Sequence, residues 1–532
     1  MSAPGSTADF IRPRQAGSLP QAFALAEQHR QAGRLQAAEG LCRQILEAVP
    51  GHAETLHLLG IIAHQAGNAA VAIELLRQAV ASDPRVPLYH CNLGEMCRLA
   101  GRVDEALAAG RQALALRPTY PEALNNLGIA HYDRGEFEEA AAQYRRAIEL
   151  APAYAQAHSN IGNALRALRR LDEAIPAYTR ALELKPDFAD AFSNRALTFH
   201  LLARFDDAVA DFRRAIALQP LHGNAHSGLA MNLLLRGRFA EGFVEYEWRW
   251  RSSELPSRPP ITTPWRGEDP RGKRLLVHCE QGLGDTLNFC RYLPLLRERG
   301  AKLVLHVQKP LRPLIADAMP WLELVAEGEA LPATDAQCSL LSLPHLFGTM
   351  PDTIPATIPY MFASQANAAR FAALVGQAPE LKVGLVWAGS PKHLNDVDRT
   401  FAFSTLAPIL DVKGVRFFSL QIGARLRDRL PDLVTDLSPE LGDFAQTAGA
   451  LSALDLLITV DTAPAHLAGA MGKPVWMLLP FVPDWRWLLE REDSPWYPTL
   501  RLFRQKTRGD WQAPVDALAK ALIELAQERN RR

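Results

Sequence analysis

The sequence predicts an α-solenoid of paired helices followed by an α/β region with two parallel sheets. Three observations lead to this prediction. Prolines recur every 34 residues in the first half, apolar strand-like runs alternate with helical stretches in the second half, and a proline-rich segment lies between the halves. The recurring prolines are Pro50, Pro84, Pro118, Pro152, Pro186 and Pro220. Such spacing is typical of helix–turn–helix units that stack only on their neighbours.

Length and composition narrow the class of protein. At 532 residues the chain is too long for one compact core, so we expect two or more domains. The 58 basic and 58 acidic residues balance, which gives no argument for a nucleic-acid or anionic membrane partner. The N-terminal residues lack the continuous apolar stretch of a signal peptide, no apolar run approaches a membrane span, and the cysteines lack CxxC spacing. We therefore expect a soluble cytoplasmic protein without a zinc site.

Composition shifts along the chain predict the domain limits. The segment from Ser252 to Lys273 is proline-rich, polar and without helical periodicity, as a linker is. The predicted segments are an N-terminal tail (1–19), the repeat solenoid (20–251), the linker (252–272), a first α/β lobe on the acceptor side (273–378) and a second α/β lobe with a C-terminal helix (379–532). We expect Trp248, Trp250 and Trp265 to pack the end of the solenoid against the first lobe rather than to stack on a sugar.

Small residues recur in register within each 34-residue unit. The matched positions hold Gly60, Gly94, Gly128, Gly162, Ala196 and Ala230, then Ala72, Ala106, Ala140, Ala174 and Ala208, then Ala79, Ala113, Ala147, Ala181 and Ala215. Small side chains let two antiparallel helices approach closely, and the proline ends each pair because it cannot continue a helix. This pattern resembles the tetratricopeptide repeat. Residues 226–250 resemble a degenerate last repeat. The outer face of a last repeat contacts something other than another repeat, so its sequence is expected to be atypical.

A second ladder in the same units consists of Asn92, Asn126, Asn160 and Asn194. Asparagine is a mediocre helix former, so its recurrence at one mid-helix position needs a reason. Tetratricopeptide solenoids face this position toward their concave groove, where a carboxamide suits the amide of an extended polypeptide. The resemblance extends to the asparagine-lined solenoid of O-linked N-acetylglucosamine transferase and favours acceptor binding. The alternative is that these side chains hydrogen-bond between neighbouring repeats and fix the superhelix.

Apolar runs in the second half predict strands buried on both faces, as in parallel sheets. The first set covers 274–279, 302–307, 322–325 and 338–343, and the second covers 383–388, 415–420, 454–460, 475–480 and 500–503. Two α/β sheets in tandem place a cleft where the carboxyl ends of their strands meet. We expect a ligand site there.

Three loops at strand ends carry the candidate site residues. The first has Gly282, Gly284 and Asp285 between a strand and a helix, without the third glycine of a dinucleotide fingerprint or the ending of a P-loop. The second supplies Ser390, Lys392, His393 and Arg399, whose cations and hydroxyl suit a diphosphate. The third has Asp461, Thr462, Ala463 and His466 at the start of a helix, where free amides form an anion site.

These loops resemble the GT-B glycosyltransferases of the ADP-heptose heptosyltransferase type, over roughly residues 274–505. The resemblance implies two Rossmann-like lobes, with Asp285 as the general base and Gly284, Asp461, Thr462, Ala463 and His466 at the nucleotide sugar. It assigns Lys392 to the phosphate, with Ser390, His393 and Arg399 beside it. Members commonly carry glycine where this chain has Ala463. The alternative is that Asp285, Asp461 and Thr462 only cap their helices.

The expected function is transfer of a sugar from a nucleotide sugar to Ser or Thr of a polypeptide held by the repeats. Similar bacterial proteins that join these modules include flagellin glycosyltransferases, so flagellin is the first acceptor to test. The resemblance implies no metal and no cofactor, and we interpret the lone Asp396-Val397-Asp398 triplet as accidental. Homodimerisation stays open. The alternatives are a non-catalytic tetratricopeptide adaptor with a vestigial transferase region and a transferase acting on a lipopolysaccharide or other glycan.

Overall fold

The computed structural model describes residues 18–252, 263–391, 396–423 and 430–531. Two compact units make up the chain, residues 1–198 and residues 199–532. The division falls inside helix α11 (Ala189–Leu201), within the repeats rather than after them. The predicted domain limits rest on the sequence pattern and stay predictions. The two compact units are defined by which residues pack together.

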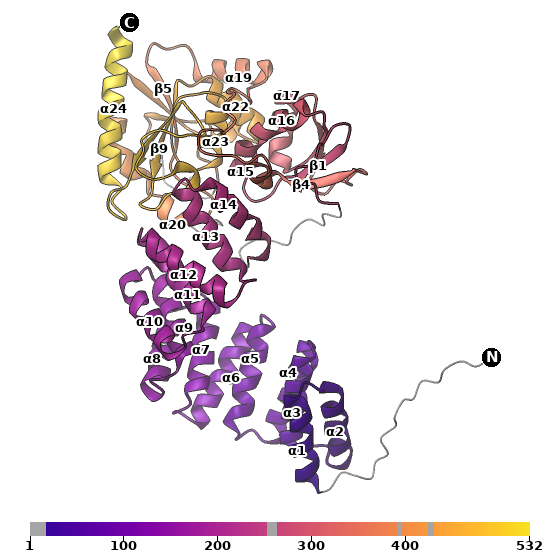
Figure 1. Cartoon of the computed structure of the whole chain (residues 1–532). Helices are drawn as coiled ribbons and strands as arrows, with labels where there is room; N and C mark the ends of the chain where they lie inside the picture. The colour runs from indigo at the N-terminus through magenta and orange to yellow at the C-terminus, as the bar shows by residue number, and fades with distance from the viewer. Residues whose placement is uncertain (1–17, 253–262, 392–395, 424–429, 532) are drawn as a thin grey trace, which may run out of the picture. The chain divides into compact units, whose positions relative to one another are not determined.

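Helix pairs build the first unit, and Figure 1 shows them as successive hairpins along the chain. They are α1 (Leu19–Gln31), α2 (Leu35–Ala48), α3 (Ala53–Gln65), α4 (Ala69–Ser82), α5 (Pro87–Leu99), α6 (Val103–Leu116), α7 (Pro121–Asp133), α8 (Phe137–Leu150), α9 (Ala155–Ala167) and α10 (Leu171–Leu184). The recurring prolines lie in the turns between pairs. Within a pair the turn needs a left-handed residue, which Gly101 supplies at φ 73° and Arg169 supplies at φ 60°.

The small residues of the repeats hold the helices of each pair together, as predicted. A Cβ atom added at Gly128 would lie 2.6 Å from the Tyr144 ring, and one at Gly162 would lie 2.7 Å from the Tyr178 ring. Tyr144 and Tyr178 are buried in one cluster with Ala140 and other small side chains. These two hairpins therefore need glycine opposite the tyrosine of the facing helix, because a larger residue would overlap the ring.

The second unit begins with the last repeats. Its first helices are α12 (Phe205–Leu218), α13 (Gly223–Leu235) and α14 (Phe239–Tyr246), followed by the 3₁₀ helix η1 (Glu247–Arg251). Phe239, Phe243 and Tyr246 pack around Trp485 with ring centroids 5.7–6.2 Å apart. The repeats and the α/β region share one hydrophobic core here, so the last repeats are part of the α/β unit.

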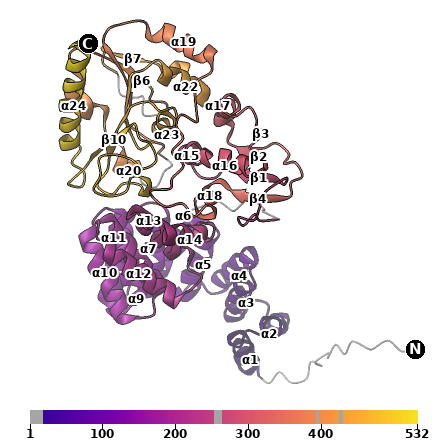
Figure 2. The same ribbon diagram turned by 45° about the horizontal axis from the view of Figure 1, so that its top comes forward.

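Two parallel sheets form the α/β region, which Figure 2 shows from a second direction. The first has the order β3-β2-β1-β4, with β1 (Arg274–His278), β2 (Lys302–Val307), β3 (Glu323–Ala326) and β4 (Ala336–Ser339). The second has the order β10-β9-β8-β5-β6-β7, with β5 (Leu381–Val386), β6 (Val415–Ser419), β7 (Val434–Asp436), β8 (Leu456–Val460), β9 (Val475–Leu479) and β10 (Leu500–Arg504). The predicted fold class, a repeat solenoid followed by two α/β lobes, is confirmed.

Helices and 3₁₀ turns connect and cover these strands. They are α15 (Leu283–Phe289), η2 (Cys290–Tyr292), α16 (Leu293–Glu298), η3 (Lys309–Leu311), α17 (Arg312–Ala318), η4 (Leu340–Ser342), α18 (Leu343–Leu346), α19 (Gln365–Val375), α20 (Asp396–Arg399), η5 (Phe403–Leu406), α21 (Ala407–Leu410), η7 (Ser438–Glu440), α22 (Phe444–Ser452), α23 (Ala463–Ala470), η8 (Trp485–Trp487) and α24 (Gln512–Arg531). Helix α19 packs closely on α22, because Gly449 of α22 leaves room for the Phe371 ring of α19.

Most predicted strands agree with the structure to within two residues at each end, and the larger differences concern β4 and β7. The run 338–343 predicts one strand, but β4 ends at Ser339 and helical turns follow. Strand β7 was not predicted, because Thr435 and Asp436 are exposed and the strand has only three residues. Within the described residues, no helix combines the length and apolar character that crossing a membrane requires. Trp265 is buried in the shared core as expected, and its indole donates to the Glu268 carbonyl at 2.9 Å.

Candidate functional site

Asp285 lies in the first turn of α15, the helix that follows β1. Its Oδ2 accepts a hydrogen bond from the Gly282 N–H at 2.8 Å, as a helix-capping aspartate does. Its Oδ1 accepts from the guanidinium of Arg486 in η8. The carboxylate is partly buried, with 19% of the side chain exposed. Both oxygens therefore have protein partners that fix the side chain, and one part of its surface remains open.

Arg486 ties Asp285 to the second lobe. Its side chain is buried, and it also donates to Asp484 at 3.0 Å. Burial lowers the pKa of Arg486, but Asp484 and Asp285 raise it by more, so the pKa lies above its ordinary value and the side chain is a permanent cation. The predicted base is thus held by a fixed positive charge.

Asp461 and His466 lie at the start of α23, after the carboxyl end of β8. The His466 Nε2 is 3.7 Å from the Asp461 Oδ1, and its Nδ1 is 3.0 Å from the Tyr497 hydroxyl. Burial alone raises the pKa of Asp461, but His466 and Arg399 outweigh it and hold the pKa well below its ordinary value. The His466 ring also stacks on Trp487, with centroids 5.3 Å apart. This carboxylate is therefore ionised and its histidine is fixed on three sides.

Thr462 occupies the N-cap position of α23 without capping it. Its hydroxyl bonds instead to the Thr459 hydroxyl at 3.0 Å and to the Val460 carbonyl at 3.2 Å. Pro464 in the first turn has no N–H. The amides of Thr462 and Ala463 therefore lie at a helix start whose own side chain does not cap it, which suits an anionic group.

Gly284 brings the two helix starts together. A Cβ atom added there would lie 2.7 Å from the His466 Cδ2 and 3.5 Å from the Ala463 Cα. Helix α15 therefore contacts α23 directly, and the carboxyl ends of the two sheets meet at this point. Only glycine permits this approach, which explains its place in the first loop.

Arg399 joins the second loop to the third. Its guanidinium donates to the Asp461 carbonyl at 2.8 Å and lies 3.4 Å from Asp396. Gly389 permits this approach, since a Cβ atom there would overlap the guanidinium. Ser390 follows it at an exposed position. Lys392 and His393 lie outside the described residues, so their predicted roles stay predictions.

The acidic triplet at residues 396–398 shows no metal-binding arrangement. Asp396 is buried and accepts from the Thr400 hydroxyl at 3.0 Å. In the part of the chain that the structure describes, no group of three or more His, Cys, Asp or Glu residues is placed to hold a metal ion.

The last repeat holds the loop that carries Asp285. Arg249, 2% exposed, donates to Glu280 at 2.6 Å and to Ser342 at 2.9 Å. Burial raises the pKa of Glu280, against the opposing effect of Arg249. The next residue, Gln281, has the left-handed φ of 60° and exchanges hydrogen bonds of 3.0–3.2 Å with the Tyr246 hydroxyl. The terminal repeat therefore fixes the conformation of residues 280–282.

Five side chains that surround the predicted residues were not predicted from the sequence. These are Arg249, Glu280, Arg486, Trp487 and Tyr497, all buried. A signal was present in the stretch Trp485-Arg486-Trp487, because an arginine between two tryptophans in an apolar context needs a buried anion. The partner itself, Asp285, is 201 positions away and was not predictable from spacing.

The asparagine ladder of the first unit makes hydrogen bonds between neighbouring repeats. Asn92 is 2.7 Å from the His57 Nε2, Asn126 donates to the Cys91 sulfur at 3.6 Å, and Asn160 donates to Asn125 at 2.9 Å. In each case the partner lies 35 positions earlier. These contacts support the structural alternative for these three residues. Acceptor binding by the ladder, Asn194 included, stays a prediction.

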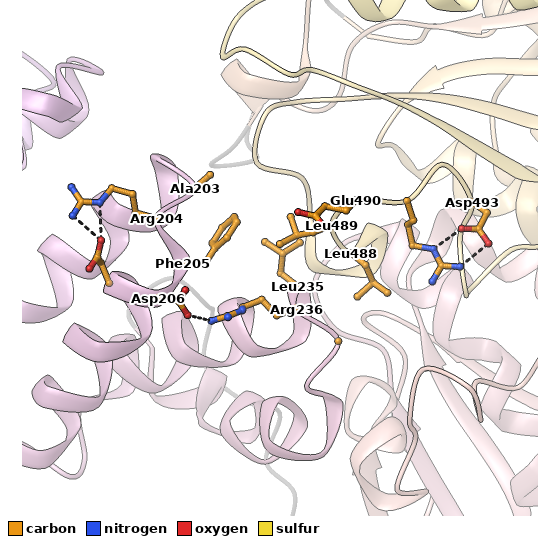
Figure 3. A pocket seen from close by; sticks show the side chains of 13 residues that line it. Ala203, Arg204, Phe205, Asp206, Leu235, Arg236, Leu488, Leu489, Glu490 and Asp493 are labelled. Carbon is orange, nitrogen blue, oxygen red and sulfur yellow. Dashed lines mark hydrogen bonds and ion pairs between the residues drawn. The ribbon is translucent and has the colours of Figure 1, made fainter.

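Two cavities lie where the last repeats meet the α/β region. The larger, about 770 Å³, is lined by turns of the repeats and by residues 488–493 (Figure 3). Its three arginines pair with its own acidic residues: Arg204 with Asp207, Arg236 with Asp206 and Arg491 with Asp493, at 2.6–2.8 Å. Because its cations are neutralised, this cavity does not suit a diphosphate. The smaller one, about 160 Å³, adjoins Asp484 and Trp485.

Protein-family models match most of the repeats and part of the α/β region. A tetratricopeptide repeat model matches residues 57–121, 125–199 and 202–251, and the model of glycosyltransferase family 9 (heptosyltransferase) matches residues 402–478. The chain therefore carries tetratricopeptide repeats and, after them, a segment that is similar to glycosyltransferase family 9. That match contains Asp461, Thr462, Ala463 and His466, whereas Asp285 lies outside it. The repeats account for the solenoid, and the second match covers the strands β6 to β9.

A curated protein is similar to about half of this chain. Protein FlbA of Caulobacter vibrioides is 31% identical over 321 residues, which are 54% of this chain and 52% of that protein. The chain therefore matches about half the length of this relative. Parts of solved structures are also similar. MamA is 27% identical over 32% of this chain and 94% of its own, with a TM-score of 0.29. A thermophilic TPR protein of Thermus thermophilus is 24% identical over 34% of this chain and 99% of its own, with a TM-score of 0.31.

Proposed function

We propose that this protein is a GT-B glycosyltransferase that moves a sugar from a nucleotide sugar to a Ser or Thr hydroxyl of a polypeptide. The glycosyltransferase family 9 domain supports glycosyl transfer itself. The observation that carries the proposal is the meeting of α15 and α23, which puts Asp285 and Asp461 at the facing carboxyl ends of two parallel sheets. We further propose that the reaction needs no metal and takes place in the cytoplasm.

The donor binds at the start of α23 in this proposal. The uncapped amides of Thr462 and Ala463 and the positive end of the helix favour the diphosphate. Arg399 adds a cation beside the same loop, and Lys392 and His393 belong to that loop in sequence. These groups stabilise the negative charge that develops on the leaving nucleotide.

Asp285 is the general base of the proposed reaction. The ion pair with Arg486 and the bond from Gly282 fix its carboxylate, so the acceptor hydroxyl meets a base of defined orientation. The hydroxyl proton passes to the Asp285 carboxylate as the oxygen attacks the anomeric carbon, and the bond from that carbon to the nucleotide breaks. The nucleotide leaves with its electron pair as the diphosphate anion.

The repeats present the acceptor, since tetratricopeptide repeats are protein-binding modules and the last repeats share a core with the site. Flagellin is the first acceptor to assay. The full chain is incubated with radiolabelled nucleotide sugars and with purified flagellin, bulk cell protein and a glycolipid extract. Label in a protein fraction supports the proposal, label only in glycolipid contradicts the acceptor class, and no binding of any nucleotide sugar in calorimetry supports the adaptor alternative.

A substitution separates chemistry from binding. Asp285→Asn is expected to lower turnover at least about 100-fold, as loss of a general base does, while nucleotide-sugar affinity stays unchanged. Asp317→Asn, an exposed aspartate of α17 in the same lobe, is the matched control. Full turnover in Asp285→Asn contradicts the role as base and leaves Asp285 as a helix cap.

A further inference from the structure

Side chains of the last repeat hold the loop between β1 and α15. Glu280 of this loop accepts from Arg249 at 2.6 Å. The next residue, Gln281, bonds to the Tyr246 hydroxyl. Both partners belong to α14 and η1, in the same compact unit as the loop. The chain that leads into Asp285 is therefore restrained from outside its own lobe.

Gln281 has a backbone conformation that residues with a side chain rarely adopt. Its φ of 60° lies in the left-handed region, where the Cβ atom crowds the following carbonyl oxygen. Such a conformation persists where the surroundings hold it. The residue is exposed, yet its carboxamide meets the Tyr246 hydroxyl with both polar atoms, Nε2 at 3.0 Å and Oε1 at 3.2 Å. The Tyr246 hydroxyl therefore supplies a restraint that this conformation needs.

Tyr246 is itself firmly placed. It is buried, its ring centroid lies 6.2 Å from that of Trp485, and the Arg249 guanidinium lies over the ring at 4.8 Å. Burial raises the pKa of the Tyr246 hydroxyl above its ordinary value, against the opposing effect of Arg249 and Arg486. The hydroxyl therefore stays protonated and can donate to the loop while it accepts from it.

The ion pair of Arg249 and Glu280 restrains the same loop. Both side chains are buried, and the Arg249 Nε and the Glu280 Oε2 have no hydrogen-bond partner among the residues that the structure describes. Apolar residues can often replace a buried ion pair without loss of stability, so stability does not by itself account for this one. Its geometric effect is to hold the residue that precedes Gln281.

The Gly282 N–H carries this restraint to Asp285. It donates to the Asp285 Oδ2 at 2.8 Å, and it belongs to the peptide plane between Gln281 and Gly282. Because that peptide is planar, the ψ angle of Gln281 sets the direction of the N–H. The other carboxylate oxygen is held separately by Arg486. A change in the Gln281 backbone therefore removes one of two bonds that orient the carboxylate.

We propose that Tyr246 is a positioning residue for Asp285. It acts through residues 281 and 282 and sets the direction of the carboxylate that receives the acceptor proton. The inference rests on the proposed function, in which Asp285 is the base. It gives the terminal repeat a part in the reaction itself, besides any part that the repeats have in presenting the acceptor.

Removal of one hydroxyl tests this role. Tyr246→Phe keeps the ring against Trp485 and is expected to lower kcat about tenfold in the labelled-sugar transfer assay, with nucleotide-sugar affinity unchanged. Tyr292→Phe is the matched control, because it removes another buried hydroxyl, which bonds to Thr349 at 2.8 Å. The control is expected to keep the original turnover. Full turnover in Tyr246→Phe, or a loss confined to donor affinity, overturns the proposal.

Two substitutions at Gln281 distinguish positioning from direct contact between this side chain and a substrate. Gln281→Gly and Gln281→Ala both remove the bonds to Tyr246, but glycine adopts the left-handed conformation without steric cost. Turnover per folded molecule is therefore expected to be at least about fivefold higher in Gln281→Gly than in Gln281→Ala. Tryptophan fluorescence gives the folded fraction. Equal losses in the two variants assign the effect to the side chain and overturn the proposal.

Hydrogen exchange separates this inference from the proposed function, because it needs no nucleotide sugar. Mass spectrometry follows exchange in the peptide of the full chain that contains Gly282. Tyr246→Phe is expected to speed this exchange about tenfold, and Tyr292→Phe to leave it unchanged. Faster exchange in a protein that transfers no sugar contradicts the proposed function and still supports the restraint on Asp285. Unchanged exchange in Tyr246→Phe, with transfer detected in the original chain, overturns the inference alone.

Discussion

The repeats of the first unit and those of the second unit share a sequence pattern but are stabilised differently. In the first unit Gly128 and Gly162 leave room for a tyrosine ring of the facing helix, and Gly228 of the second unit does the same for Phe212. In residues 199–251 the outer face in addition buries Phe239, Phe243 and Tyr246 against Trp485 of the α/β region. A repeat stacks on whatever follows it, so the terminal repeat diverges where its neighbour is no longer a repeat.

Charged residues show the same contrast. Arg43 and Glu39 of the first unit form an exposed pair with 66% and 41% of their side chains accessible. Arg249 and Glu280 form a pair with 2% and 5% accessible. An exposed pair contributes little because water solvates both partners, whereas a buried ion left alone is costly. We therefore expect a substitution in the buried pair to lower the free energy of unfolding much more than one in the exposed pair.

The largest expected effect comes from breaking the buried pair. Arg249→Met leaves the Glu280 carboxylate buried without its cation and is expected to destabilise the second unit by about 3–5 kcal/mol. Urea unfolding followed by tryptophan fluorescence measures it, because all ten tryptophans lie between residues 248 and 511. Arg43→Met is the control, with an expected change below about 1 kcal/mol. Equal effects in the two variants contradict the contrast.

A smaller effect is expected inside the first unit. Gly162→Ala places a methyl group on the Tyr178 ring and is expected to cost about 1–3 kcal/mol through overpacking. Gly40→Ala, with open space around an exposed position of α2, is expected to stabilise its helix by about 0.5–1 kcal/mol. Circular dichroism of the helices follows both. A fluorescence transition that moves with Gly162→Ala shows that the two units unfold together.

The pH dependence of stability probes the second unit again. The pKa of Asp461 is held at about 2 against an ordinary 3.8, so its contribution is complete above the ordinary value and disappears as pH falls through the folded one. The original chain is expected to lose stability between about pH 4 and pH 2. Asp461→Asn has no carboxylate to protonate at this position. Its free energy of unfolding, measured by tryptophan fluorescence, is therefore expected to change less over the same pH range. An identical pH profile for Asp461→Asn and Asp317→Asn contradicts the shift.

The smallest expected effect concerns the asparagine ladder. Asn160→Ala removes the bond to Asn125 between repeats and is expected to cost about 1 kcal/mol in the first unit. If the ladder also binds the acceptor, Asn126→Ala and Asn160→Ala together weaken binding of an unfolded acceptor polypeptide while the circular dichroism spectrum stays the same. Unchanged acceptor affinity assigns these asparagines to the solenoid alone.

The strand pattern predicted the sheets well because buried parallel strands are continuous apolar runs. Strands β2 and β9 begin at the predicted residues, while β7 escaped prediction because an exposed edge strand of three residues has no such run. The candidate site followed the same logic. Asp285, Asp461 and His466 lie in the loops or first helical turns that follow strands, and such positions are visible in sequence.

The rest of the site was not predictable, because it depends on which distant segments pack together. Tyr497 reaches His466 across 31 positions, Arg249 reaches Glu280 across 31, and Arg486 reaches Asp285 across 201. No local pattern encodes such pairs. Their side chains are polar and buried, and burial of a polar group is favourable only beside its particular partner.

The sequence by itself determined the repeat unit, the parallel strands and the loops that carry the candidate residues, because helix and strand periodicities and glycine positions are local properties. Only the tertiary structure decided that the last repeats belong to the α/β unit and that Arg486 holds Asp285. It also decided that two cavities form where the last repeats meet the α/β region. These features arise from packing between surfaces that are far apart in the chain, where shape and charge complementarity select the partner.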